Sequence, residues 1–138
     1  MITFKRFYFV LFFCFSSVLG LAQSTNSANK EAKELLNKAG QSFLKLDSKK
    51  SLDFAQRALI LATKNNNDLL ASKAYNLIGL NFGEFADYKK AIEFYNKGLL
   101  LAIKVDNDTV KGWLNNNLGN LYCYRKIDFS KGIKHYKE

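Results

Sequence analysis

The sequence repeats itself at an interval of 40 residues, and this repeat limits the possible folds more than any other feature. Residues 47–68 align with residues 87–108, and 10 of these 22 positions are identical. A third, incomplete copy follows after one inserted residue, with residues 128–133 matching residues 87–92. Repeats of this length are typical of solenoids, in which each unit buries its apolar face only by packing against its neighbours.

Each unit is predicted to form two antiparallel helices. In the middle unit, Ala91, Tyr95, Leu99 and Ala102 recur every three or four residues, which is the spacing of one helix face. The chain contains no proline, a residue that breaks helix interiors. The predicted helices cover residues 28–45, 49–64, 69–83, 88–104, 109–124 and 129–138. We therefore expect an all-α, right-handed superhelical solenoid of helix pairs, with units at about residues 30–67, 68–107 and 108–138.

Aspartate residues mark the expected helix starts, because a carboxylate accepts hydrogen bonds from the free N–H groups of a first helical turn. Asp68 and Asp108 are predicted to cap the first helix of their units. Asp47, Asp87 and Asp128 lie at the predicted turn into the second helix.

The units resemble the tetratricopeptide repeat (TPR) family, in which large, small and aromatic residues alternate in fixed slots of two helices. The slots of the second unit are filled by Tyr75, Ile78, Gly79, Phe82, Ala91, Tyr95 and Gly98. Those of the third are filled by Leu118, Gly119, Tyr122, Gly132 and Tyr136, and those of the first, more weakly, by Leu35, Ala39, Ser51, Ala55 and Ala58. The 40-residue period exceeds the usual ~34 and is similar to the longer-helix branch found in bacterial signalling proteins.

This resemblance implies a scaffold that binds a protein or peptide partner along the concave face made by the first helix of each unit. The side chains predicted to line that groove are Lys73, Asn76, Leu80, Trp113, Asn116, Asn120 and Tyr124. An asparagine amide both donates and accepts, so it can pair with a peptide main chain of any sequence. The alternative is that these amides bond to a neighbouring helix or to water.

The first 22 residues have the pattern of an export signal. Lys5 and Arg6 precede the apolar run 7–18, and residues 20–22 offer a cleavage site. The run is shorter than the ~20 apolar residues of a membrane-spanning helix, so an uncleaved anchor is the minority alternative. We expect a signal-peptide helix, a polar linker at residues 23–29, and a periplasmic or extracellular location.

The remaining chemistry predicts neither an enzyme nor a cofactor or metal site. Lysines are interleaved with acidic residues along the chain, although its formal net charge is +9, so no nucleic-acid partner is expected. His135 is predicted to be an exposed helical residue, since a general base needs a positioned partner. Cys123 is predicted to be a small buried or groove-facing thiol.

The third unit ends after a short second helix, with no capping helix after it. This arrangement predicts marginal stability and a C-terminal surface that docks a partner or a second copy of the chain. The alternative function is that of a shortened sensor portion of a bacterial signal-transduction regulator, without the membrane and output domains.

Overall fold

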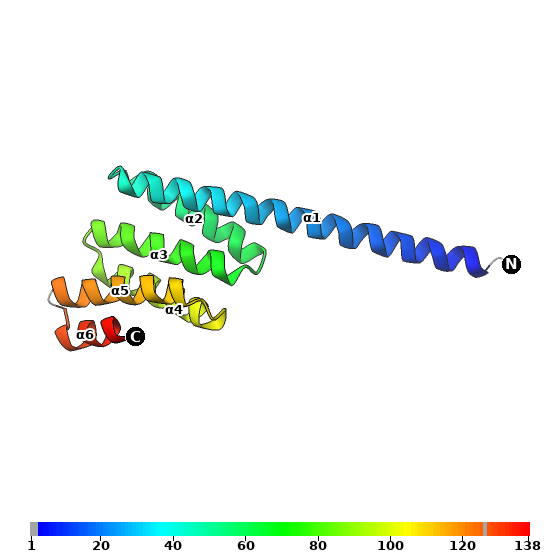
Figure 1. The fold of residues 1–138 in the computed structure, drawn as a ribbon. Coiled ribbons are helices and arrows are strands. Elements are labelled where there is room, and N and C mark those ends of the chain that lie inside the picture. The colour runs from blue at the N-terminus through cyan, green and yellow to red at the C-terminus, as the bar shows by residue number, and fades with distance from the viewer. Residues whose placement is uncertain (1–2, 126) are drawn as a thin grey trace.

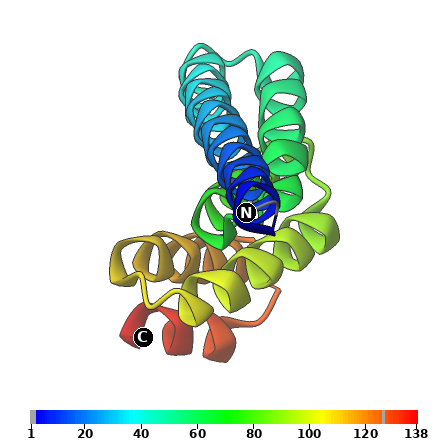
Figure 2. The same ribbon diagram turned by 90° about the vertical axis from the view of Figure 1, so that its right-hand side faces the viewer.

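A computed structural model describes residues 3–125 and 127–138, with side chains described from residue 24 onwards. These residues form six helices, which Figure 1 shows as successive antiparallel pairs. They are α1 (Thr3–Leu44), α2 (Ser48–Lys64), α3 (Asp68–Glu84), α4 (Tyr88–Lys104), α5 (Asp108–Tyr124) and α6 (Phe129–Lys137). Each pair packs against the next along the chain, and Figure 2 shows the same stack viewed along the helices, with the N-terminus of α1 toward the viewer.

Five of the six helices lie within one residue of their predicted bounds, and α1 is the exception. It contains residues 23–29, for which we expected a linker. These residues include no proline or glycine, so nothing in the sequence interrupts the helix. The side chains of the predicted export signal lie outside the described residues. Among the residues that the structure describes, no helix combines the length and apolar character needed to cross a membrane.

The first four turns between helices share one three-residue design. The third turn residue donates its N–H to the carbonyl of the residue five positions earlier, as when Asp47 N–H bonds the carbonyl of Ser42 at 2.9 Å. Its side chain then caps the next helix, with Asp47 accepting from the N–H of Lys50 at 3.1 Å. This double use of one residue closes the previous helix and starts the next with little intervening chain.

The capping residues correct part of the prediction. Asn67 and Asn107 cap α3 and α5, whereas Asp68 and Asp108 are the first helical residues. An acidic residue at that position still interacts favourably with the positive end of the helix. The predicted aspartate caps of α2, α4 and α6 are confirmed.

The residue before the cap of α2, α3, α4 and α5 has a left-handed backbone, which only glycine, asparagine and aspartate adopt readily. The four residues are Leu46, Asn66, Ala86 and Asp106, with φ between 50° and 61°. None of the four is glycine, and Leu46 is also 87% exposed.

Matched small and large residues hold each pair of helices together. A Cβ added at Gly79 would lie 2.5 Å from the ring of Tyr95, and one at Gly119 would lie 2.7 Å from the ring of Tyr136. In the first unit the same register holds two alanines, Ala39 and Ala55, both fully buried. The helices of each pair therefore pack closely in all three units, with a glycine against a tyrosine in two of them and an alanine against an alanine in the first.

Candidate functional site

The first helix of each pair, α1, α3 and α5, contributes to a common face of the molecule, with α3 in contact with both of the others. A groove of about 440 Å³ lies on this face, and we call it the first groove. It is lined by Leu36, Asn37, Gly40, Gln41, Lys73, Asn76, Leu77 and Trp113.

The first groove combines an aromatic surface, amide groups and a cation. Trp113 is 49% exposed, which leaves much of its indole ring available to a partner. Lys73 forms no ion pair with any other described residue. Gly40 leaves the groove open, because a Cβ added there would meet nothing within 4 Å. A polypeptide could thus find apolar contact, hydrogen bonds and an ammonium group in one place.

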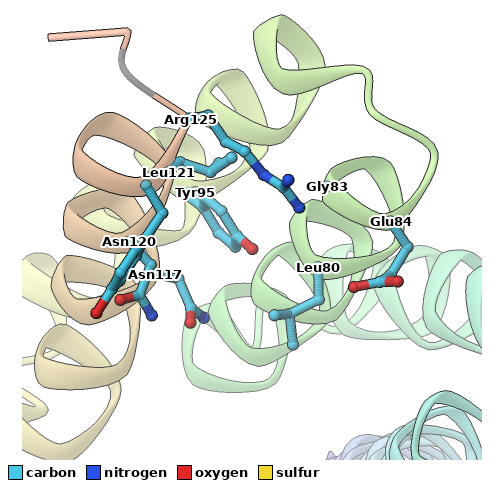
Figure 3. A pocket seen from close by; sticks show the side chains of 9 residues that line it. Leu80, Gly83, Glu84, Tyr95, Asn117, Asn120, Leu121 and Arg125 are labelled. Carbon is cyan, nitrogen blue, oxygen red and sulfur yellow. The ribbon is translucent and has the colours of Figure 1, made fainter.

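A second hollow of about 230 Å³, here called the second pocket, lies between α3, α4 and α5 (Figure 3). It is lined by Leu80, Gly83, Glu84, Tyr95, Asn117, Asn120, Leu121, Tyr124 and Arg125. Glu84 and Arg125 bring opposite charges to its rim, and Leu80 and Leu121 provide apolar surface.

Asparagine amides separate the two hollows and connect one of them to α6. Asn117 of the second pocket donates from Nδ2 to Oδ1 of Asn76, a residue of the first groove, at 2.8 Å. Asn120 accepts a 2.7 Å bond at Oδ1 from the hydroxyl of Tyr136. Asn76 and Asn120 therefore each bond to a neighbouring helix through the amide oxygen, which is the alternative role considered for them, while their amide nitrogens stay available.

The structure distributes six of the seven predicted groove residues over the two hollows. The first groove contains Lys73, Asn76 and Trp113, and the second pocket contains Leu80, Asn120 and Tyr124. Asn116 is exposed and lines neither of them.

Sequence reasoning missed the contribution of α1 and the charged rim of the second pocket. The signal for α1 was present: the 40-residue offset carries Asn76 and Leu77 onto Leu36 and Asn37, which both line the first groove. No comparable signal pointed to Glu84 and Arg125, because each lies at the end of its helix, where the repeat is least regular.

The prediction that His135 is an exposed helical residue is wrong. His135 is not exposed: its side chain is 18% accessible, its ring stacks on Tyr122, and Nδ1 lies 3.0 Å from Oδ1 of Asn115. Burial lowers the pKa of His135, and nearby Lys134 also lowers it, whereas Glu138 acts in the opposite direction. Cys123 is partly buried against Gly132 of α6, at a position where a Cβ on that glycine would collide with its sulfur.

The fold is similar to that of a solved structure, the crystal structure of the TPR domain of Arabidopsis FLU. The two share 18% sequence identity with a TM-score of 0.72, over 80% of this chain and 92% of the other. No family model and no curated protein sequence matches the chain. The predicted all-α, tetratricopeptide-type solenoid is thereby confirmed as the fold.

Proposed function

We propose that this tetratricopeptide-type solenoid is an interaction scaffold that binds a segment of another polypeptide in the first groove. The observation that carries the proposal is the grouping of a half-exposed Trp113 and an ion-pair-free Lys73 in one open groove. Tryptophan residues at such positions often supply a large share of the binding energy, because a partner desolvates a large rigid ring.

The first groove suits an extended chain segment. Asn37, Gln41 and Asn76 supply amides that donate to or accept from a peptide main chain, whatever its side chains are. The ammonium group of Lys73 would form an ion pair with a carboxylate of the partner, next to the amides that contact its main chain. Apolar contact with Trp113 would then position the segment, and the polar groups would set its orientation.

The test is the capture of partners from a cell-envelope extract by the full-length chain and by two variants. Gly40→Leu fills the first groove from a position with open space, and it replaces a helical glycine by a better helix former. Trp113→Ala removes the proposed anchor. Both should reduce capture of the same partner at least about tenfold, the effect of losing ~1.4 kcal/mol of binding free energy.

Gly112→Ala is the matched control, since Gly112 also has open space around it but does not line the first groove. It should capture like the wild type. Equal capture by wild type, Gly40→Leu and Trp113→Ala would contradict the proposal. These variants test the groove more specifically than alanine substitutions of Asn76 and Asn120, because those substitutions would also remove hydrogen bonds between helices.

We also propose that the chain is exported, on the basis of the predicted signal at residues 1–22. Cell fractionation should find the protein outside the cytoplasm, shortened at its N-terminus, and deletion of residues 2–22 should retain it in the cytoplasm. An unshortened cytoplasmic protein would contradict export.

The second candidate function is the sensor portion of a bacterial signal-transduction regulator, favoured by the 40-residue period. Specific co-capture of a membrane-bound kinase or a DNA-binding regulator would support it. Capture of envelope proteins alone would argue against it.

A further inference from the structure

The hydroxyl of a largely buried tyrosine opens into the second pocket. Tyr95 is only 3% exposed, because its ring is enclosed against Gly79. Its hydroxyl makes no hydrogen bond with any described residue, and it points into the space near Leu80 and Arg125 (Figure 3). Among the described residues, the buried side-chain oxygen without a hydrogen-bond partner is Oδ1 of Asn81, so the Tyr95 hydroxyl is accessible from the pocket. A group bound in the pocket can therefore form a hydrogen bond with it.

Two asparagines add one donor and one acceptor to the same pocket. Asn117 and Asn120 are three residues apart on α5 and therefore share a helix face. Asn117 already uses Nδ2, which leaves Oδ1 to accept, and Asn120 already uses Oδ1, which leaves Nδ2 to donate. Together with the Tyr95 hydroxyl, they offer hydrogen bonds of both kinds over a short span.

The charges at the rim balance each other. Glu84 and Arg125 are both exposed, and neither forms an ion pair with another described residue. The guanidinium of Arg125 instead lies 5.1 Å from the centre of the Tyr88 ring. An anionic ligand group would be attracted by Arg125 and repelled by Glu84, and a cationic group would meet the reverse. A neutral group with both donors and acceptors avoids either penalty.

We infer that the second pocket binds a primary carboxamide, the side chain of a glutamine or asparagine in the bound polypeptide. The carboxamide oxygen accepts from Tyr95 and Asn120, and its NH₂ group donates to Asn117 or Glu84. Burial raises the pKa of Tyr95 far above its usual range, and the Glu84 carboxylate raises it further, so the hydroxyl keeps its proton. Leu80 and Leu121 contact the aliphatic part of the side chain.

This inference rests on the proposed function, because it adds a side-chain preference to the binding of a polypeptide. Its test needs no natural partner. The probes are N-acetyl methylamides of glutamine, glutamate, lysine and methionine, which differ only in the side chain. Each is titrated into the full chain carrying isotope-labelled tyrosine, and binding is followed by the NMR shifts of the Tyr95 ring.

The glutamine probe should bind at least about tenfold more tightly than the other three. Tyr95→Phe removes only the hydroxyl and keeps the ring on Gly79, and it should weaken glutamine binding about tenfold, followed at the Asn120 side-chain amide. Gly83→Leu should abolish binding by filling the pocket, since a Cβ at Gly83 meets nothing within 4 Å. Gly112→Ala is the matched control and should leave probe binding unchanged, because Gly112 also has open space around it and lines neither hollow.

Three results would overturn the inference: no saturable shift with the glutamine probe, equal or tighter binding of the glutamate or lysine probe, or unchanged binding in Tyr95→Phe. The two proposals fail separately. Loss of partner capture in Gly40→Leu tests the first groove, whereas the probe titration reports on the second pocket alone.

Discussion

The contact between Gly79 and Tyr95 allows a quantitative test of how the helix pairs are held together. Gly79→Ala places a methyl group 2.5 Å and 2.6 Å from two carbons of the Tyr95 ring. The ring cannot move away freely, because Tyr95 is 3% exposed and packed on its other sides. Gly83→Ala, one turn later in α3, adds the same methyl group where nothing lies within 4 Å.

The two substitutions should therefore have opposite effects. Alanine is favoured over glycine in a helix by ~1 kcal/mol, and this gain is available at both positions, although less fully at Gly83 near the helix end. Overpacking costs ~1–3 kcal/mol and applies only at Gly79. Gly79→Ala should lose about 1 kcal/mol of unfolding free energy, whereas Gly83→Ala should gain up to about 1 kcal/mol.

The assay is urea denaturation of the full chain, followed by far-UV circular dichroism. A double-mutant cycle with Tyr95→Ala identifies the cause, because the penalty of Gly79→Ala should disappear once the ring is gone. The first unit already packs an alanine pair, Ala39 and Ala55, in this register. Gly79→Ala as stable as Gly83→Ala, or a penalty that persists without the Tyr95 ring, would refute the reasoning.

Three further outcomes are expected. Leu46→Asn should stabilise the chain by about 1 kcal/mol, because asparagine tolerates the left-handed backbone better, and Asn66→Leu should destabilise it by a similar amount in the same denaturation assay. Asp87→Ala should cost about 1 kcal/mol through loss of the α4 cap, seen as a lower melting temperature. Burial lowers the pKa of His135 in the folded state, so the unfolded chain binds more protons as the pH falls through the ordinary histidine pKa of 6.5. Stability should therefore fall as the pH falls through this value, and His135→Gln should flatten the dependence.

The repeat in the sequence was sufficient to predict the helices and the way in which they pair. Each helix carries an apolar face with a fixed period, and each turn has a capping side chain, so these local signals agree along the chain. The errors are local as well. Asn67 and Asn107, not the adjacent aspartates, cap their helices, because one turn residue serves both neighbouring helices. Residues 23–29, expected to be a linker, belong to α1, and they contain no proline or glycine that would interrupt it.

The candidate site was predictable only in part. The sequence placed Lys73, Asn76 and Trp113 on one face, because helical periodicity determines which residues of one helix lie together. It did not show that a hydrogen bond from the Asn117 side-chain amide to that of Asn76 separates two hollows.

The sequence by itself thus determined the repeat, the helix positions and the small residues at which helices approach closely. Only the tertiary structure decided which amide atoms remain free, where Tyr95 directs its hydroxyl, and that Glu84 and Arg125 line one pocket. The physical reason is the separation of the interacting residues along the sequence, because helix formation and capping depend on residues only a few positions apart. The pocket instead depends on side chains of α3, α4 and α5, which become neighbours only when the helix pairs stack.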